Sequence, residues 1–80
     1  MSTPTDWIEI SHILRQAEEI SKDGTNVVIK IDGERLEDSF TVVFSGGPLG
    51  DDFFRKDGAD LKTLLQEAIA FYTTTKSVGG

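Results

Sequence analysis

The sequence predicts a small α+β domain in which two helices pack on one face of a short antiparallel sheet. Three observations predict it: an amphipathic helical pattern near each end of the chain, a strand pattern of period two in the middle, and glycine-containing turns between them. The 80 residues are enough for one domain. We expect this single domain over residues 1–80, with its core at about 4–74 and a flexible C-terminal tail at 75–80. The expected order is helix, strand, strand, a candidate third strand, helix.

The first helix is expected to start at Thr3. Thr3 would cap the helix, Pro4 suits the first helical position, and Asp6 completes a capping box. The pair Asp23-Gly24 ends the helix, because glycine suits the left-handed conformation after a helix C-terminus. The apolar side chains recur at the spacing of one helical face, which predicts a buried stripe. The members of this stripe are Trp7, Ile10, Ile13, Leu14, Ala17 and Ile20.

Two strands are expected in the middle of the chain, at 26–32 and 39–45. Both alternate in the period of two that is typical of a half-buried strand. In the second strand the residues expected to face the helices are Phe40, Val42 and Phe44, and those expected on the open face are Thr41 and Val43.

The turn between these strands allows two registers. Asp32-Gly33 is a strong turn signal. A tight turn there sets Ile29 opposite Leu36, whereas a wide loop sets Ile29 opposite Val42. Both registers keep Leu36 on the helix-facing side of the sheet, because the shift is even. The acidic residues at 37–38 dilute the strand pattern, so we favour the wide loop.

A glycine-rich loop, Gly46–Gly50, follows the second strand. It lacks the residues of a phosphate-binding loop, so we interpret it as a strand connection. Leu49 is expected at its tip, where it would be available for recognition. Residues 52–56 form the candidate third strand.

The second helix is expected to begin after Asp57, with Asp57 as the cap and Asp60 three residues on. The β-branched residues Thr73–Thr75 weaken its end, which is why a tail is expected beyond them. Its apolar face consists of Leu61, Leu64, Leu65, Ala68, Ile69, Phe71 and Tyr72.

No residue pattern in the chain indicates an enzyme, a metal site or a cofactor site. The chain has no cysteine, which excludes thiolate nucleophiles and cysteine-based metal sites. Its one histidine, His12, falls on the solvent side of the first helix with nothing to fix a nucleophile beside it. The carboxylate pairs lie in turns and caps, where aspartate has ordinary structural roles. We therefore expect no catalytic residue, no cofactor and no metal.

The lack of cysteine, the short apolar runs and the start of the chain favour a cytoplasmic protein. Its apolar runs are only a few residues long, so none spans a membrane. Met1–Asp6 has no basic start and no apolar core, so it does not resemble a signal peptide.

The net charge of −6 favours a protein partner with a basic surface. Most of this charge lies between Asp32 and Asp60, where only Arg35, Arg55 and Lys56 oppose the acids. Binding of nucleic acid or an anionic membrane needs clustered Lys and Arg, so neither is expected. The residues expected to bind the partner are Glu34, Glu37, Asp38, Thr41, Val43, Leu49, Asp51 and Asp52.

These observations predict a small acidic protein–protein interaction module. Compact acidic domains of this size often act as stoichiometric inhibitors of the toxin-immunity or anti-defence kind, an analogy of size and charge rather than of motif. The alternative is a structural domain that forms a homodimer through the sheet face or a strand edge, in which the acids serve solubility.

Overall fold

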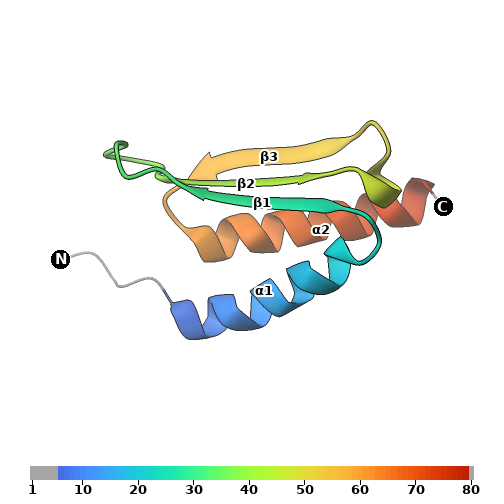
Figure 1. Ribbon diagram of the computed structural model, residues 1–80, viewed down its shortest axis with the longest axis horizontal. Helices are drawn as coiled ribbons and strands as arrows, with labels where there is room; N and C mark the ends of the chain where they lie inside the picture. The colour runs from blue at the N-terminus through green and yellow to red at the C-terminus, as the bar shows by residue number, and fades with distance from the viewer. Residues whose placement is uncertain (1–5, 80) are drawn as a thin grey trace.

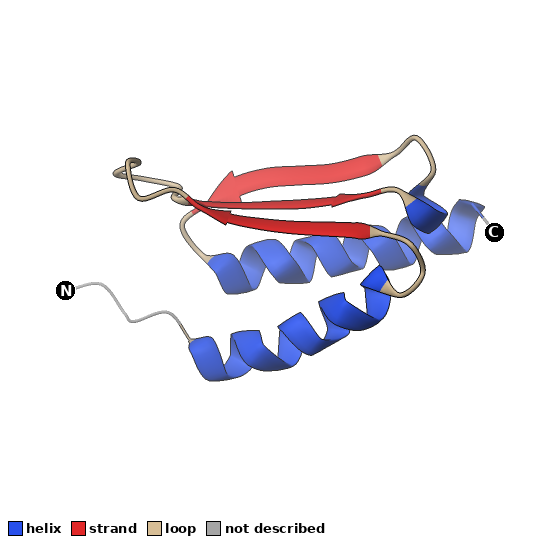
Figure 2. Cartoon of the chain, viewed as in Figure 1, coloured by secondary structure: helices blue, strands red, loops and turns tan. Residues whose placement is uncertain are grey.

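The computed structural model describes residues 6–79, and it confirms the predicted fold class (Figures 1 and 2). Three antiparallel strands form one sheet in the order β1-β2-β3, and the candidate third strand is present. Both helices lie on the same face of this sheet. The elements in chain order are α1 (Trp7–Ser21), β1 (Asn26–Ile31), β2 (Phe40–Ser45), a 3₁₀ turn (Gly47–Leu49), β3 (Phe53–Gly58) and α2 (Leu61–Gly79).

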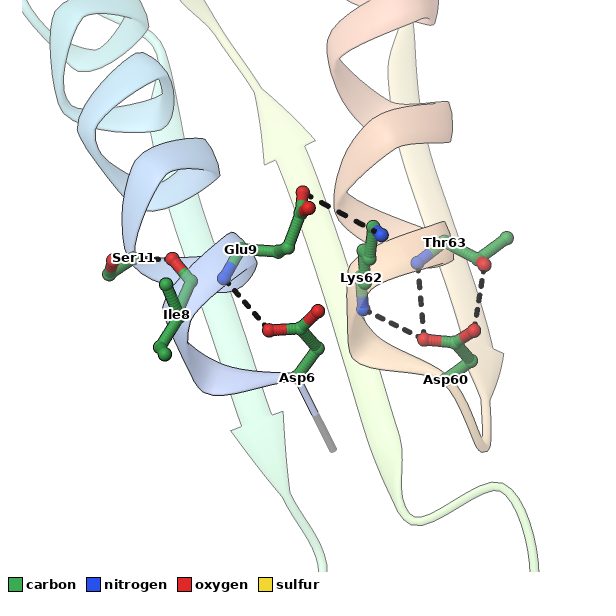
Figure 3. Close-up of polar contacts among 7 residues, drawn as sticks. All are labelled: Asp6, Ile8, Glu9, Ser11, Asp60, Lys62 and Thr63. Carbon is green, nitrogen blue, oxygen red and sulfur yellow. Dashed lines mark hydrogen bonds and ion pairs between the residues drawn. The ribbon is translucent and has the colours of Figure 1, made fainter. Parts of the chain in front are cut away.

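Helix α1 begins later than the sequence indicates. The cap and proline predicted at positions 3–4 lie outside the described residues. Within them the helix starts at Trp7, and Asp6 is itself the cap, since its carboxylate accepts the N–H of Glu9 at 3.0 Å (Figure 3). The chain leaves the helix through Gly24, whose φ of 92° confirms the left-handed glycine predicted there.

The buried face of α1 is narrower than predicted. Trp7 and Leu14 are 54% and 39% exposed, although both were expected in the buried stripe. They lie seven residues apart and therefore share one flank of the helix. The other flank turns toward α2, where Glu9 lies 3.7 Å from the ammonium of Lys62 (Figure 3). The residues of α1 that are buried are Ile10, Ile13, Ala17 and Ile20.

The register between β1 and β2 is the one that a wide loop gives. Ile29 pairs with Val42, which confirms the favoured alternative. The N–H of Asp32 donates to the carbonyl of Ser39 at 2.8 Å, one step beyond the strands. Residues directly opposite in the ladder share a face. The apolar residues on the helix-facing side are Val27, Ile29, Ile31, Phe40, Val42, Phe44 and Phe54.

The centre of the core lies between β2 and α2. Val42 and Phe44 of β2 are fully buried and so are Ile10 of α1 and Leu65 of α2. At one side of this core the ring centroid of Phe54 in β3 lies 5.9 Å from the ring centroid of Phe71 in α2. The most apolar strand of the sequence is thus the middle strand, and it is the one on which α2 packs most closely.

The start of α2 differs by three residues from the prediction. Asp57 was expected to cap it, but β3 continues through Gly58 and leaves Asp57 in the sheet. The cap is Asp60, whose carboxylate accepts the N–H groups of Lys62 and Thr63 (Figure 3). Both aspartates fit the same capping pattern, and only the length of β3 decides between them.

Helix α2 also extends further than predicted, to Gly79. The sequence predicts its end near Thr73–Thr75 and a tail after it. β-Branched residues cost only a few tenths of a kcal/mol each in a helix, so packing can override them. Here Tyr72 and Lys76 both bond the carboxylate of Asp23, which follows α1.

Candidate protein-interaction surface

The loop between β1 and β2, residues 32–39, is held in shape by one arginine. The Nη1 of Arg35 donates to the carbonyl of Asp38 at 3.1 Å, and its Nη2 lies 3.5 Å from the carboxylate of Asp57 in β3. The carboxylate of Asp32 accepts the N–H of Glu34 at 3.0 Å, which forms a local turn. Arg35 therefore connects two parts of the loop with each other and also connects the loop with β3.

The outer part of this loop presents an apolar side chain among acids. Leu36 is fully exposed, although both predicted registers placed it on the helix-facing side. That prediction was wrong because residues 33–38 leave the ladder and are not strand. Glu34, Glu37 and Asp38 are also exposed, and none of the three carboxylates joins an ion pair within the described residues. We call residues Glu34–Asp38 the acidic tip.

Thr41 and Asp57 stabilise the acidic tip, because Thr41 binds Asp57 and Asp57 binds Arg35. They lie opposite each other in the β2–β3 ladder, and the Thr41 hydroxyl donates to the Asp57 carboxylate. This hydrogen bond and the charges of Arg35 and Arg55 hold the pKa of Asp57 below its ordinary value. Thr41 is on the open face, as predicted, but only 6% of it is exposed. It therefore acts as a support for the loop rather than as a contact residue.

The open face of the sheet carries apolar and cationic side chains, with Asp57 beside Thr41 as the acid of β3 on this face. Val43 lies at its centre and is half-buried. Its neighbours in the ladder are Val28 of β1 and Arg55 of β3. Lys30 lies on the same face, and so does Phe53, which is 62% exposed and which the sequence analysis did not single out.

The glycine-rich loop at the other end of the sheet does not display Leu49. That prediction was wrong, since Leu49 is only 3% exposed and belongs to the core. The 3₁₀ turn brings it inward against α2. Asp51 and Asp52 remain exposed beside it, and the apolar residue exposed next to them is Phe53 at the start of β3.

The two acidic ends lie far apart, as the antiparallel order of the strands predicts. The acidic tip precedes β2 and Asp51-Asp52 follow it, so they sit at opposite ends of the sheet (Figure 1). A strand of six residues is about 20 Å long. Lys30 and Arg55 stand on the open face between the ends, which separates them electrostatically as well.

Most of the cations of the described chain are already paired, and five of the eight carboxylates that join no ion pair lie at these two ends. Among the described basic residues only Arg15 and Arg55 join no ion pair. The pairs within residues 6–79 are Lys22–Glu19, Lys30–Asp32, Arg35–Asp57, Lys56–Glu67, Lys62–Glu9 and Lys76–Asp23.

Models of protein families, curated proteins and solved structures gave no match to this chain. The arrangement of its own residues therefore carries the functional argument. His12 is exposed on α1, as predicted. In the part of the chain that the structure describes, no three His, Asp or Glu side chains come together as metal ligands. No helix in this part is long and apolar enough to cross a bilayer.

A shallow groove runs between the C-terminal half of α1 and the start of β1. Its volume is about 480 Å³, and Leu14, Ala17 and Val27 form its apolar part. Thr25 also lines it, and the buried hydroxyl of Thr25 has no hydrogen-bond partner within the described residues. This groove exists because α1 leans on α2 more closely than on β1, which the sequence pattern alone does not reveal.

The acidic tip could be located from the sequence, but its rigidity could not. Its acids were predicted as partner-binding residues, and in the structure Glu34, Glu37 and Asp38 are exposed in the same loop as Leu36. The signal for the clamp was Arg35, the one cation among these acids. The sequence did not reveal Asp57 as the partner of Arg35, because Asp57 was expected to cap a helix.

Proposed function

We propose that this protein is a small interaction module that docks through its acidic tip on a basic surface of a target protein and acts there as a stoichiometric inhibitor. One observation carries the proposal. A fully exposed leucine, Leu36, stands in a loop that Arg35 clamps, among carboxylates that have no cationic partner in the described chain.

The chemistry of the acidic tip fits a protein–protein anchor. An exposed leucine gains about 1.5–3 kcal/mol when a partner buries it. The surrounding carboxylates of Glu34, Glu37 and Asp38 steer a basic partner into place and raise its association rate. Because Arg35 already orders the loop, binding loses less conformational entropy than it would with a mobile loop.

The proposed footprint is confined to one end of the sheet. Arg55, which joins no ion pair within the described residues, lies on the open face and would repel a basic partner that extended along β2. At the far end, Leu49 is buried, and the exposed Phe53 that follows Asp51 and Asp52 lies on the same face as the cation of Arg55. Asp51 and Asp52 are expected to contribute long-range attraction only.

The test is affinity capture from an extract of the source cells, using the immobilised protein and three variants. Leu36→Ala removes the apolar anchor, and Glu37→Lys/Asp38→Lys reverses the charge of the tip. Asp51→Lys/Asp52→Lys is the matched control, since it makes the same charge change at the other end. We expect a basic protein that the wild type and the control retain and that both tip variants lose.

The captured protein, once purified, is then measured against each variant. We expect 1:1 binding, an association rate that falls steeply between low and physiological salt, and affinity at least about tenfold weaker for Leu36→Ala. Equal capture by the wild type and both tip variants would contradict the proposal. So would equal losses for the tip variants and the control, because that pattern indicates unspecific attraction by net charge.

A further inference from the structure

One edge of the sheet carries unpaired backbone groups. β1 is an edge strand. The N–H of Asp32 donates to the carbonyl of Ser39, the residue before β2. The even-numbered residues of β1 therefore direct their N–H and C=O groups toward β2. Val27, Ile29 and Ile31 therefore direct their N–H and C=O groups outward. Outside the ladder itself, no backbone hydrogen bond within residues 6–79 involves these three residues.

The two edges of the sheet differ in how they resist pairing with another strand. The edge strand β3 carries three consecutive charged residues, Arg55, Lys56 and Asp57, which oppose association. The edge strand β1 has a single charged residue, Lys30, and this side chain points to the open face, 3.9 Å from the carboxylate of Asp32. The helix-facing row of β1 is entirely aliphatic, so its edge lacks this protection.

Exposed apolar side chains lie along the same side of the molecule. Ile31 faces the helix layer but is 61% exposed. Leu14 of α1 lines the groove with Val27 of β1. Trp7 shares the flank of Leu14, one heptad earlier, and is exposed as well. β1 and the flank of α1 below it thus form a strip that carries apolar side chains and free backbone groups, with Glu18 and Ser21 as polar residues of the groove between them.

We propose that a second copy of this chain pairs with this strip, antiparallel along β1, with the two-fold axis at Ile29. The result is a six-stranded sheet with all four helices on one face. The register follows from two conditions: outward-directed residues must pair with each other, and the aliphatic rows must share a face. With Ile29 opposite Ile29, Val27 of each copy lies opposite Ile31 of the other. A shift by two residues leaves one outward-directed residue of each copy unpaired.

Charge and size both favour a second copy as the occupant. Antiparallel pairing places the two acidic tips at opposite ends of the assembly, and the paired strands bring together no unneutralised charge, since Lys30 has Asp32 beside it. The molecule exposes 5536 Å². A stable interface takes about 800 Å² from each partner, which a strand and a helix about 22 Å long can supply together.

The first test measures the mass of the protein in solution by sedimentation equilibrium over a range of concentrations. We expect reversible dimers of the 8.8 kDa chain. Ile31→Lys should weaken the dimer by about tenfold or more, because it places a charge in the aliphatic row of the interface. Phe53→Lys is the matched control, since Phe53 is equally exposed on the far strand, and it should leave dimerisation unchanged. Circular dichroism confirms that both variants fold.

The second test examines the register, and the absence of native cysteine makes it clean. Ile29→Cys places the two sulfurs opposite each other, at a Cα separation of about 5.5 Å that suits a disulfide. Ile31→Cys is the control, because the two copies of residue 31 lie four positions apart, about 13 Å. We expect mild oxidation to link the first variant and not the second.

A protein that stays monomeric at every concentration overturns the proposal. A dimer that Phe53→Lys weakens and Ile31→Lys does not also overturns it, since that dimer uses the open face. Failure of Ile29→Cys to form the link overturns the register. The acidic-tip variants should not change dimerisation, so this inference and the proposed function can fail separately.

Discussion

The hydroxyl of Tyr72 in α2 donates a hydrogen bond to the carboxylate of Asp23, which lies in the loop between α1 and β1. The ammonium of Lys76, one turn later, lies 3.2 Å from the same carboxylate oxygen. One carboxylate thus joins the C-terminal half of α2 to the connection between the first helix and the sheet. This contact explains why α2 continues beyond the threonine run at 73–75.

Removing the hydroxyl tests the contribution of this contact. Tyr72→Phe keeps the buried ring but loses the hydrogen bond to Asp23. We expect the melting temperature to fall by about 5 °C, the shift that one typical hydrogen bond causes in a domain of this size. Thermal unfolding followed by circular dichroism measures it. The exposed Thr74→Ala is the control, and an equal fall in both variants would show that the effect comes from the helix rather than from the contact.

The same carboxylate predicts how stability depends on pH. The hydrogen bond from Tyr72, then the bond and charge of Lys76, hold the pKa of Asp23 below its ordinary value of 3.8. Asp23 in turn raises the pKa of Tyr72 above 10.0 and that of Lys76 above 10.5. The depressed Asp23 stabilises the fold above pH 3.8, and this stability is lost as the pH falls through its folded pKa. The raised Tyr72 and Lys76 stabilise the fold below their ordinary values, and this is lost as the pH rises through their folded pKa values.

Asp23→Asn should therefore act at both ends of the pH range. We expect the free energy of unfolding, measured by urea denaturation from acid to alkaline pH, to vary less steeply below pH 4 and above pH 10 than in the wild type. The acid limb keeps a residual slope, because the pKa values of Asp57 and Asp60 are also lowered, chiefly by hydrogen bonds from Thr41 and Thr63. A variant that loses slope at the acid end alone would contradict the coupling of Asp23 to Tyr72 and Lys76.

A close backbone contact makes Gly47 sensitive to substitution. Its φ is 56°, and a Cβ placed there would lie 2.8 Å from the backbone N of Thr25 and 2.9 Å from the carbonyl O of Asp23. Gly47→Ala should lower the free energy of unfolding by more than about 2 kcal/mol, because neither the left-handed backbone nor the contact accepts a methyl group. Gly33→Ala is the control, since a Cβ there meets nothing within 4 Å. Urea denaturation should show little change for it.

The alternation of apolar residues in the strands predicted most of the fold, because this pattern reflects burial along a single element. The alternation of Phe40, Val42 and Phe44 predicted both the faces of β2 and, with the wide loop, the register against Ile29. Element ends were less predictable. The capping patterns of Asp57 and Asp60 are equivalent locally, and only pairing of β3 with β2 shows which aspartate caps α2.

The candidate site was predicted only in part, because the contacts that shape it join residues that are far apart in the sequence. Acids at 34, 37 and 38 are visible in the sequence, but the clamp on their loop depends on Arg35 reaching Asp57, more than twenty residues later. The orientation of a turn residue such as Leu49 depends on what packs behind the turn, here α2. The exposure of Trp7 and Leu14 on α1 has a similar cause. Both residues fit the apolar period of the helix, but α1 packs more closely on α2 than on β1, which leaves their flank uncovered.

Two leucines in turns should respond oppositely to truncation. Leu49 is buried in the core, so Leu49→Ala should lower the free energy of unfolding by about 2–4 kcal/mol. Leu36 is fully exposed, so Leu36→Ala should change it by less than about 0.5 kcal/mol. Both values come from urea denaturation. A large loss for Leu36→Ala would mean that the leucine packs against the fold, which would remove the basis for assigning it as a binding anchor.

Arg35 should control the order of the acidic tip without controlling the fold. Arg35→Ala removes the bond to the Asp38 carbonyl and the ion pair with Asp57, so the loop should open more often. We expect faster amide hydrogen exchange at residues 34–38 and unchanged exchange in β2, measured by NMR. Arg35→Lys is the informative control: lysine keeps the charge but cannot hold two acceptors in the fixed geometry of a guanidinium. It should give intermediate exchange. If the tip is equally ordered in all three proteins, Arg35 is not the clamp, and the low entropic cost that we assign to docking at Leu36 has no structural source.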